Sequence, residues 1–108
     1  MGALRFGIFS FARDPYDQLR DTWRRVEKLG VDSAWTDDDR NVPGYSDFEP
    51  WTLLGALARD TTRLRIGTLV SVPPFRHPSL LAAQIVTVDR LSGGRVNVGL
   101  GTGGPPNP

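Results

Sequence analysis

Hydrophobic residues follow two periods along the chain, one typical of strands and one typical of helices. A short apolar and aromatic run, Leu4 to Ser10, predicts a strand. Apolar residues then recur at steps of three and four, as on one face of an amphipathic helix: Tyr16, Leu19, Trp23, Val26 and Leu29. Asp14-Pro15 fits the N-cap and first position of this helix, and Gly30 is placed to end it.

The same alternation of strand and helix continues along the chain. Short runs rich in β-forming residues predict strands at Ser33 to Thr36, Leu64 to Ser71 and Arg95 to Gly101. Helices are predicted between them, from about Pro50 to Arg59 and from Pro78 to Leu91, with a pair of glycines after the second. The four strands begin near residues 4, 33, 64 and 95, so the repeat is about 30 residues long.

This repeat predicts strand–helix units whose right-handed crossovers make neighbouring strands parallel. The expected fold class is therefore α/β. A parallel sheet of this kind either stays open and doubly wound or closes into an eight-stranded barrel, which takes about 250 residues. With 108 residues, the chain is expected to hold one domain and half of such a barrel.

Composition and charge argue against several classes of protein. The absence of cysteine excludes a disulfide framework, a thiolate zinc site and a cysteine nucleophile. The longest apolar stretches are too short for a membrane span, and the N-terminal residues do not form a signal peptide pattern, so a cytosolic protein is expected. The 13 basic and 12 acidic residues are scattered, which disfavours a nucleic-acid partner.

The glycine-rich segment Gly99 to Gly104 matches the dinucleotide-binding pattern G-x-G-x-x-G. A Rossmann-type site is disfavoured, because Pro105-Pro106 stands where that site needs a helix and because the preceding strand is the fourth. What remains is a glycine turn at the carboxyl end of a strand, whose N–H groups can hold an anion or the edge of a polar ring. An ordinary tight turn is the alternative.

Charged side chains follow the second and third strands. Asp37-Asp38-Asp39 either contains a carboxyl with a raised pKa that acts as acid or base, or binds a divalent cation, or forms a solvated acidic loop, the reading that composition favours. His77, the single histidine, is interpreted as a turn residue near a helix start. Arg76 beside it is interpreted as a phosphate ligand or as a surface residue.

Two segments, Arg65 to Pro78 and Asp89 to Gly103, resemble the bacterial luciferase-like family of flavin-dependent oxidoreductases and monooxygenases. The likeness rests on D-R-L-S-G-G-R with the strand after it and on the F-R-H-P turn, and it spans nearly the whole chain. It implies a TIM barrel that binds FMN or, in one branch, the deazaflavin coenzyme F420, and that catalyses monooxygenation or hydride transfer. Residues 1–108 are then expected to be the N-terminal half of such a barrel, truncated after strand 4.

The resemblance also implies cofactor-binding residues. Leu69-Val70 matches the strand bulge at which the family has a non-proline cis peptide behind the flavin ring. Four residues match the G-T-G-x-x-x-N stretch with which the deazaflavin branch holds its cofactor: Gly101, Thr102, Gly103 and Asn107. Because Gly104 replaces the usual acid of that branch, the choice between FMN and deazaflavin stays open.

After the second strand the family commonly has an acid followed by histidine, and the matching pair here is Asp38-Asp39. The resemblance therefore implies that Asp38 binds the cofactor and that Asp39 relays a proton as the catalytic residue. The missing imidazole makes luciferase-type and sugar-phosphate dehydrogenase-type chemistry less expected. No metal is implied.

Two functions from different classes follow. The first is a flavin-dependent oxidoreductase acting on a small molecule, with a separate flavin reductase if reduced FMN is used with oxygen. The second is a catalytically silent half-barrel that only folds or oligomerises. In both cases self-association is expected, because an open parallel sheet exposes its edges and its inner face.

Overall fold

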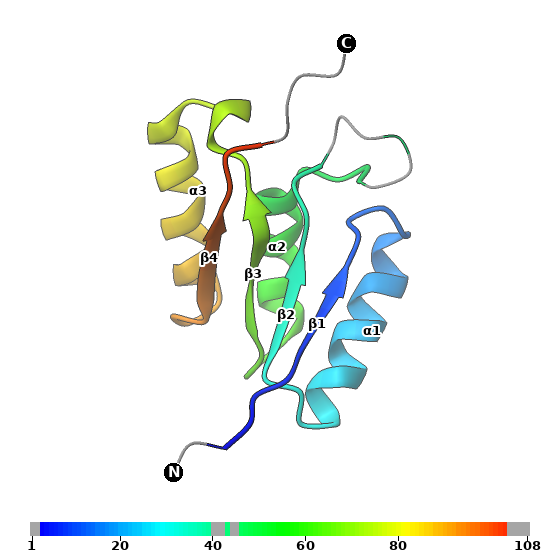
Figure 1. Ribbon diagram of the computed structural model, residues 1–108. Helices are drawn as coiled ribbons and strands as arrows, with labels where there is room; N and C mark the ends of the chain where they lie inside the picture. Colours follow the sequence, from blue (N-terminus) through cyan, green and yellow to red (C-terminus); the bar gives the residue numbers. More distant parts are fainter. Residues whose placement is uncertain (1–2, 40–42, 44–45, 104–108) are drawn as a thin grey trace.

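Figure 1 shows the computed structural model of the chain, in which residues 3–39, 43 and 46–103 are described. Strands and helices alternate, as the sequence predicts. In chain order the elements are β1 (Gly7–Ser10), α1 (Tyr16–Lys28), β2 (Ser33–Thr36), α2 (Pro50–Asp60), β3 (Arg65–Ser71), the 3-10 helix η1 (Pro73–Phe75), α3 (Pro78–Leu91) and β4 (Val96–Leu100).

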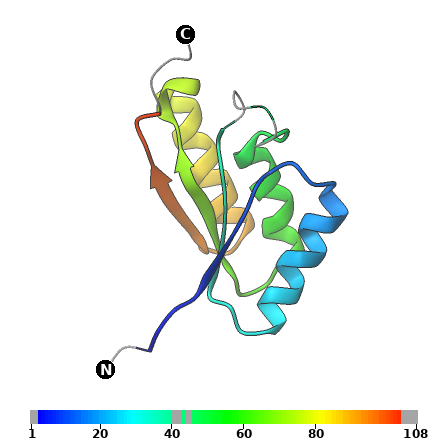
Figure 2. The same ribbon diagram turned by 45° about the vertical axis from the view of Figure 1, so that its right-hand side comes forward.

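The four strands form one parallel sheet in the order β1-β2-β3-β4. A doubly wound sheet reverses its strand order at a switch point, whereas each strand here pairs with the next one in the chain. Successive right-handed crossovers in one direction place every helix on the same face, and Figures 1 and 2 show α1, α2 and α3 together on that face. The predicted α/β class is confirmed, and the arrangement is that of a partial barrel.

The face of the sheet that meets the helices carries the core. Ile8, Ala34, Ile66 and Val96 lie in register across the four strands, and all four belong to or pack against the buried cluster. Side chains alternate between faces along a strand, so the neighbouring row points to the opposite face. Within the described part of the chain, no helix covers that second face. It corresponds to the inside of a barrel.

Glu27 near the end of α1 ties this helix to the loop that leads into β3. Its carboxylate accepts hydrogen bonds from the backbone N–H groups of Thr62 (3.0 Å), Arg63 (2.7 Å) and Leu64 (2.7 Å). Burial works to raise the pKa of Glu27, but the hydrogen bonds from Arg63, Leu64 and Thr62 together lower it below its ordinary value. The charged form of Glu27 therefore helps to place β3 beside β2.

Several predicted boundaries differ from the structure. The first strand begins at Gly7, because its pairing with β2 starts there and Leu4 and Phe6 are exposed. The prediction of Asp14 as N-cap is wrong: Pro15 is the cap, without a side-chain capping bond, and its extended ψ of 141° places the first helical residue at Tyr16. Gly30 adopts a φ of 90° and ends α1 as predicted.

Among the residues that the structure describes, no helix has both the length and the apolar composition needed to cross a membrane. The cytosolic location stays a prediction of the sequence.

Candidate functional site at the carboxyl ends of the strands

The carboxyl ends of all four strands lie at one edge of the sheet, at the top of Figure 1. Hydrogen bonds donated by backbone N–H groups connect them in chain order. The N–H of Ala12 donates to Asp37 Oδ1 (3.0 Å), the N–H of Val72 donates to Asp38 Oδ2 (2.8 Å), and the N–H of Gly101 donates to the carbonyl oxygen of Ser71 (2.9 Å). We call this edge the rim; it comprises residues 11–12, 37–39, 69–72 and 101–103.

The three consecutive aspartates of the rim have different environments. Asp37 and Asp38 are each 1% exposed, so the prediction of a solvated acidic loop is wrong for both. Each is buried because it accepts backbone hydrogen bonds, Asp37 from the segment after β1 and Asp38 from the segment after β3. Within the described residues, no group of three or more His, Cys, Asp or Glu side chains is arranged to hold a metal ion.

Asp38 forms a buried ion pair with Arg76. The two guanidinium nitrogens lie 2.8 Å from the two carboxylate oxygens, and Glu49 Oε2 lies 3.2 Å from the same guanidinium. The side chains of Asp38 and Arg76 are 0% and 5% exposed. Arg76 is therefore neither a surface residue nor an available phosphate ligand, and this corrects both interpretations made from the sequence.

Asp39 is the half-buried member of the acidic run, and its backbone N–H donates to Asp37 Oδ2 at 3.3 Å. Burial, followed by the charges of Asp37 and Asp38, raises the pKa of the Asp39 carboxyl above its ordinary value. A carboxyl with a raised pKa is the kind of group that acts as a general acid or base. Asp39 is thus the rim carboxyl best suited to proton transfer.

The end of β3 forms a bulge. Pairing with β4 shifts register between Thr68 and Ser71, and the peptide bond between the two intervening residues, Leu69 and Val70, is cis, as the resemblance implies. Leu69 is 52% exposed, whereas Thr68 and Ser71 are 0% exposed. The bulge therefore presents the apolar side chain of Leu69 at the rim, while the residues on either side of the bulge are buried.

The glycine turn after β4 lies against this bulge. A Cβ on Gly101 would lie 2.5 Å from Val70 Cγ2, and Gly103 has a φ of 81°, which favours glycine. The N–H of Gly101 already binds Ser71, but those of Thr102 and Gly103 have no acceptor among the described residues, and both residues are exposed. Two backbone donors at the rim can therefore bind a polar ligand.

The single histidine and the C-terminal residues were also assigned roles from the sequence. His77 caps α3: its side chain accepts a hydrogen bond from the N–H of Ser79 (3.1 Å), which confirms it as a residue of the helix start. Asn107 lies outside the described residues, as do Gly104 and the two prolines after it. Their assigned roles stay predictions.

Sequence reasoning did not find the buried partners of the rim. Arg76 is 38 residues from Asp38, and Trp51 is 20 residues from Ser71, whose hydroxyl it contacts. No local pattern joins such pairs. The only signal in the sequence was the position of Arg76 in the F-R-H-P turn directly after a strand.

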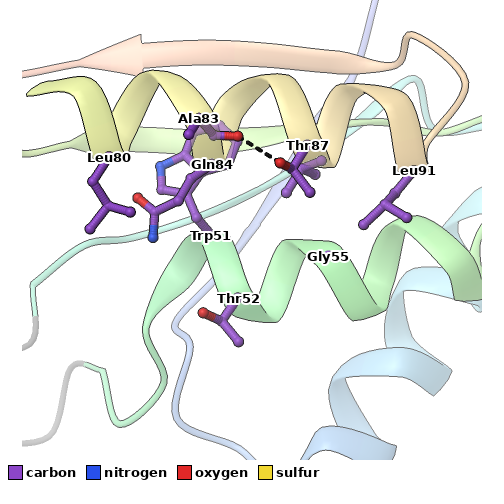
Figure 3. Close-up of a pocket in the computed structure, with 9 residues that line it drawn as sticks. Trp51, Thr52, Gly55, Leu80, Ala83, Gln84, Thr87 and Leu91 are labelled. Atoms are coloured by element: carbon purple, nitrogen blue, oxygen red, sulfur yellow. Dashed lines mark hydrogen bonds between the residues drawn. The ribbon is translucent and has the colours of Figure 1, made fainter.

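A separate cavity of about 360 Å³ lies between α2 and α3 on the outer surface (Figure 3). Its lining contains no ionisable side chain. The residues that line it are Trp51, Thr52, Gly55, Leu80, Ala83, Gln84, Thr87, Val88 and Leu91. The groove therefore has no side chain that can move a proton, whereas the rim carries the Asp39 carboxyl and the backbone donors of Thr102 and Gly103.

Comparisons with known proteins support the partial-barrel fold. The sequence profile of the family described as luciferase-like monooxygenase matches residues 4–108. Over 86 residues the chain is 40% identical to the F420-dependent glucose-6-phosphate dehydrogenase of Amycolatopsis mediterranei (strain U-32), covering 73% of this chain and 25% of that protein.

Two solved structures have the same fold over nearly the whole chain. The coenzyme F420-dependent tetrahydromethanopterin reductase of Methanopyrus kandleri superimposes with a TM-score of 0.85 at 28% identity, covering 95% of this chain and 28% of that one. The oxygenating constituent of 3,6-diketocamphane monooxygenase from Pseudomonas putida, in complex with FMN, also gives 0.85, at 21% identity, with 96% and 31% covered.

The chain thus spans between a quarter and a third of the length of these relatives. The sequential parallel sheet, the bulge at the end of β3 and the profile match from residue 4 to residue 108 agree with one another. The chain belongs to the luciferase-like monooxygenase family.

Proposed function

We propose that the rim forms part of the cofactor site of a flavin- or deazaflavin-dependent oxidoreductase that acts on a small molecule. The observation that carries this proposal is the linkage of the four strand ends. It brings the apolar tip of β3, the Asp39 carboxyl and the amides of Thr102 and Gly103 to one edge. In a barrel of this type the active site is built at that edge.

The residues present fit an aromatic ring with a polar edge. Leu69 offers an exposed apolar surface against which a planar ring can pack. Thr102 and Gly103 offer backbone N–H donors at a turn whose glycines, Gly101 and Gly103, pack closely against Val70 and Val72. A bound flavin or deazaflavin would supply the hydride or oxygen chemistry, and the protein binds and orients it.

Asp39 acts as acid or base in this proposal. Burial, followed by the charges of the two buried carboxylates next to it, raises the pKa of its half-buried carboxyl above that of an ordinary aspartate. Asp38, in contrast, has its two oxygens bound by Arg76 and by the N–H of Val72. We therefore assign Asp38 to the support of the site, and Asn107 keeps its proposed role as a cofactor ligand.

The relatives named above include proteins dependent on coenzyme F420 and one in complex with FMN. The 40% identical relative is F420-dependent, whereas Gly104 replaces the usual acid of the deazaflavin branch. The proposed cofactor is accordingly F420 or FMN, tested in parallel.

The test is a fluorescence titration of the chain with FMN and, separately, with F420. We expect a saturable change with at least one of them. Leu69→Ala should weaken binding, whereas Leu80→Ala should not, since Leu80 is a leucine of equal exposure, 51% against 52%, in the groove between α2 and α3. No saturable signal with either cofactor would refute the proposal and favour a half-barrel without catalytic function.

Self-association is part of the proposal. The strands β1 and β4 are the edges of the sheet, and Phe9 and Leu100 on them are 43% and 60% exposed. A second copy can cover such edges, since closing a sheet removes unpaired strand edges. Light scattering should show a molar mass that rises with protein concentration. A monomer at all concentrations would refute self-association. If FMN serves oxygen chemistry, a flavin reductase is the expected second partner.

A further inference from the structure

A series of three hydrogen bonds, two of them buried, runs through the foot of the β3 bulge. Trp51 Nε1 donates to Ser71 Oγ (2.9 Å), the hydroxyls of Ser71 and Thr68 lie 2.6 Å apart, and Thr68 Oγ1 donates to the carbonyl oxygen of Gly99 (3.1 Å). Each hydroxyl has one proton. Because Thr68 gives its proton to the carbonyl oxygen of Gly99, Ser71 must donate to Thr68. The three hydrogen bonds therefore run in one direction, from α2 through β3 to β4.

The two hydroxyls bracket the residues that protrude at the rim. Thr68 and Ser71 stand on either side of Leu69-Val70, at the positions where the register with β4 shifts. Their contact closes the base of the bulge, and both side chains are 0% exposed. The next backbone N–H, that of Val72, is bound by Asp38. The bulge is thus fixed on the sides of β2, α2 and β4.

We propose that the hydroxyls of Thr68 and Ser71 are positioning residues for the cofactor: without touching it, they hold the Leu69-Val70 tip at the height and angle that the ring meets. The proposal rests on the proposed function, in which this tip packs against the ring. Buried hydrogen bonds of this kind specify one conformation, because an unpaired donor or acceptor in the same place is costly.

Thr68 permits a test with matched variants. Thr68→Val removes the hydroxyl with little change in volume, so Ser71 loses its acceptor and the carbonyl of Gly99 loses its donor. Thr68→Ser keeps the hydroxyl and loses only a methyl group. Asp38 is less suitable, because its removal leaves the buried Arg76 guanidinium without its bidentate carboxylate.

Thr61→Val is the control at the other end of the sheet. Thr61 is also buried, 5% exposed, and its hydroxyl donates to the carbonyl oxygen of Leu57 (2.8 Å) at the end of α2. The same hydroxyl accepts a hydrogen bond from Arg95 Nη1 (2.9 Å), so like that of Thr68 it both donates and accepts, but neither of its partners lies at the rim. If weaker cofactor binding came only from a loss of stability, Thr61→Val and Thr68→Val would weaken binding alike.

The measurement is the dissociation constant of whichever cofactor the unaltered chain binds, FMN or F420, with urea unfolding of each variant beside it. We expect about tenfold weaker binding for Thr68→Val, the factor that corresponds to one misplaced hydrogen bond, and binding within about twofold of the unaltered chain for Thr68→Ser and Thr61→Val. If Thr68→Val does not fold, Ser71→Ala breaks the same chain and should weaken binding to the same extent.

Three results overturn the proposal. Unchanged binding by Thr68→Val, or by Ser71→Ala if that variant replaces it, refutes the positioning role while the proposed cofactor site stands. Equal weakening by Thr61→Val shows that binding follows stability and not the hydroxyl chain. Absence of binding by the unaltered chain refutes the proposed function and this inference together.

Discussion

Replacement of Gly101 by alanine tests how tightly the turn after β4 packs on the bulge of β3. The added Cβ would lie 2.5 Å from Val70 Cγ2 and 3.4 Å from Val70 Cβ. Carbon atoms pack at about 3.5–4.0 Å, so the first contact is too short by about 1 Å. Valine has few alternative rotamers, and overpacking of this kind costs about 1–3 kcal/mol. We expect Gly101→Ala to destabilise the chain by that amount.

The assay is urea unfolding of Gly101→Ala, Val70→Ala and the double variant. Val70→Ala removes Cγ2, so in that background Gly101→Ala should cost at least about 1 kcal/mol less than in the unaltered chain. The denaturant slope m should stay the same in all variants, since the fold is retained. An equal cost of Gly101→Ala in both backgrounds would refute the packing argument, because the contact with Val70 would then not be its cause.

Three further predictions concern stability and charge. Glu27→Gln should cost about 1.5 kcal/mol at neutral pH. In urea unfolding this difference should shrink as pH falls below the unfolded pKa of about 4.3 and vanish only below the folded pKa, which is lower; a difference unchanged at pH 3 contradicts it. Gly55→Ala should stabilise α2 by about 0.5–1 kcal/mol, since Leu91 Cδ1, the nearest atom to the added Cβ, is 3.8 Å away; a lower melting temperature contradicts it. Carbon-13 NMR should show Asp39 titrating above the ordinary value of about 3.9, and an ordinary titration contradicts the raised pKa.

The fold followed from the sequence because its signals are local. Apolar spacing of three and four residues identified the helices, and the repeat of strand and helix required parallel strands. Parallel strands in turn required that Asp37–Asp39 and the glycine turn lie at one edge. The resemblance to the luciferase-like family supplied the cis peptide at Leu69-Val70, which the structure contains.

The roles of individual polar residues did not follow in the same way, because they depend on contacts between distant segments. Three identical aspartates in sequence become two buried structural carboxylates and one half-buried acid, according to which neighbouring strand end each one meets. Arg76 and Ser71 likewise have partners at least 20 residues away. Tertiary contacts decide these roles, and the periodicity of the sequence does not predict such contacts.

On the proposed function, the cofactor binds at the rim. Nitrogen-15 NMR of the unaltered chain, titrated with FMN and with F420, tests it most directly because every backbone amide reports separately. If the cofactor binds at the rim, the largest saturable shifts fall on Leu69, Val70, Thr102 and Gly103. Shifts confined to the groove between α2 and α3, or none with either cofactor, would contradict it.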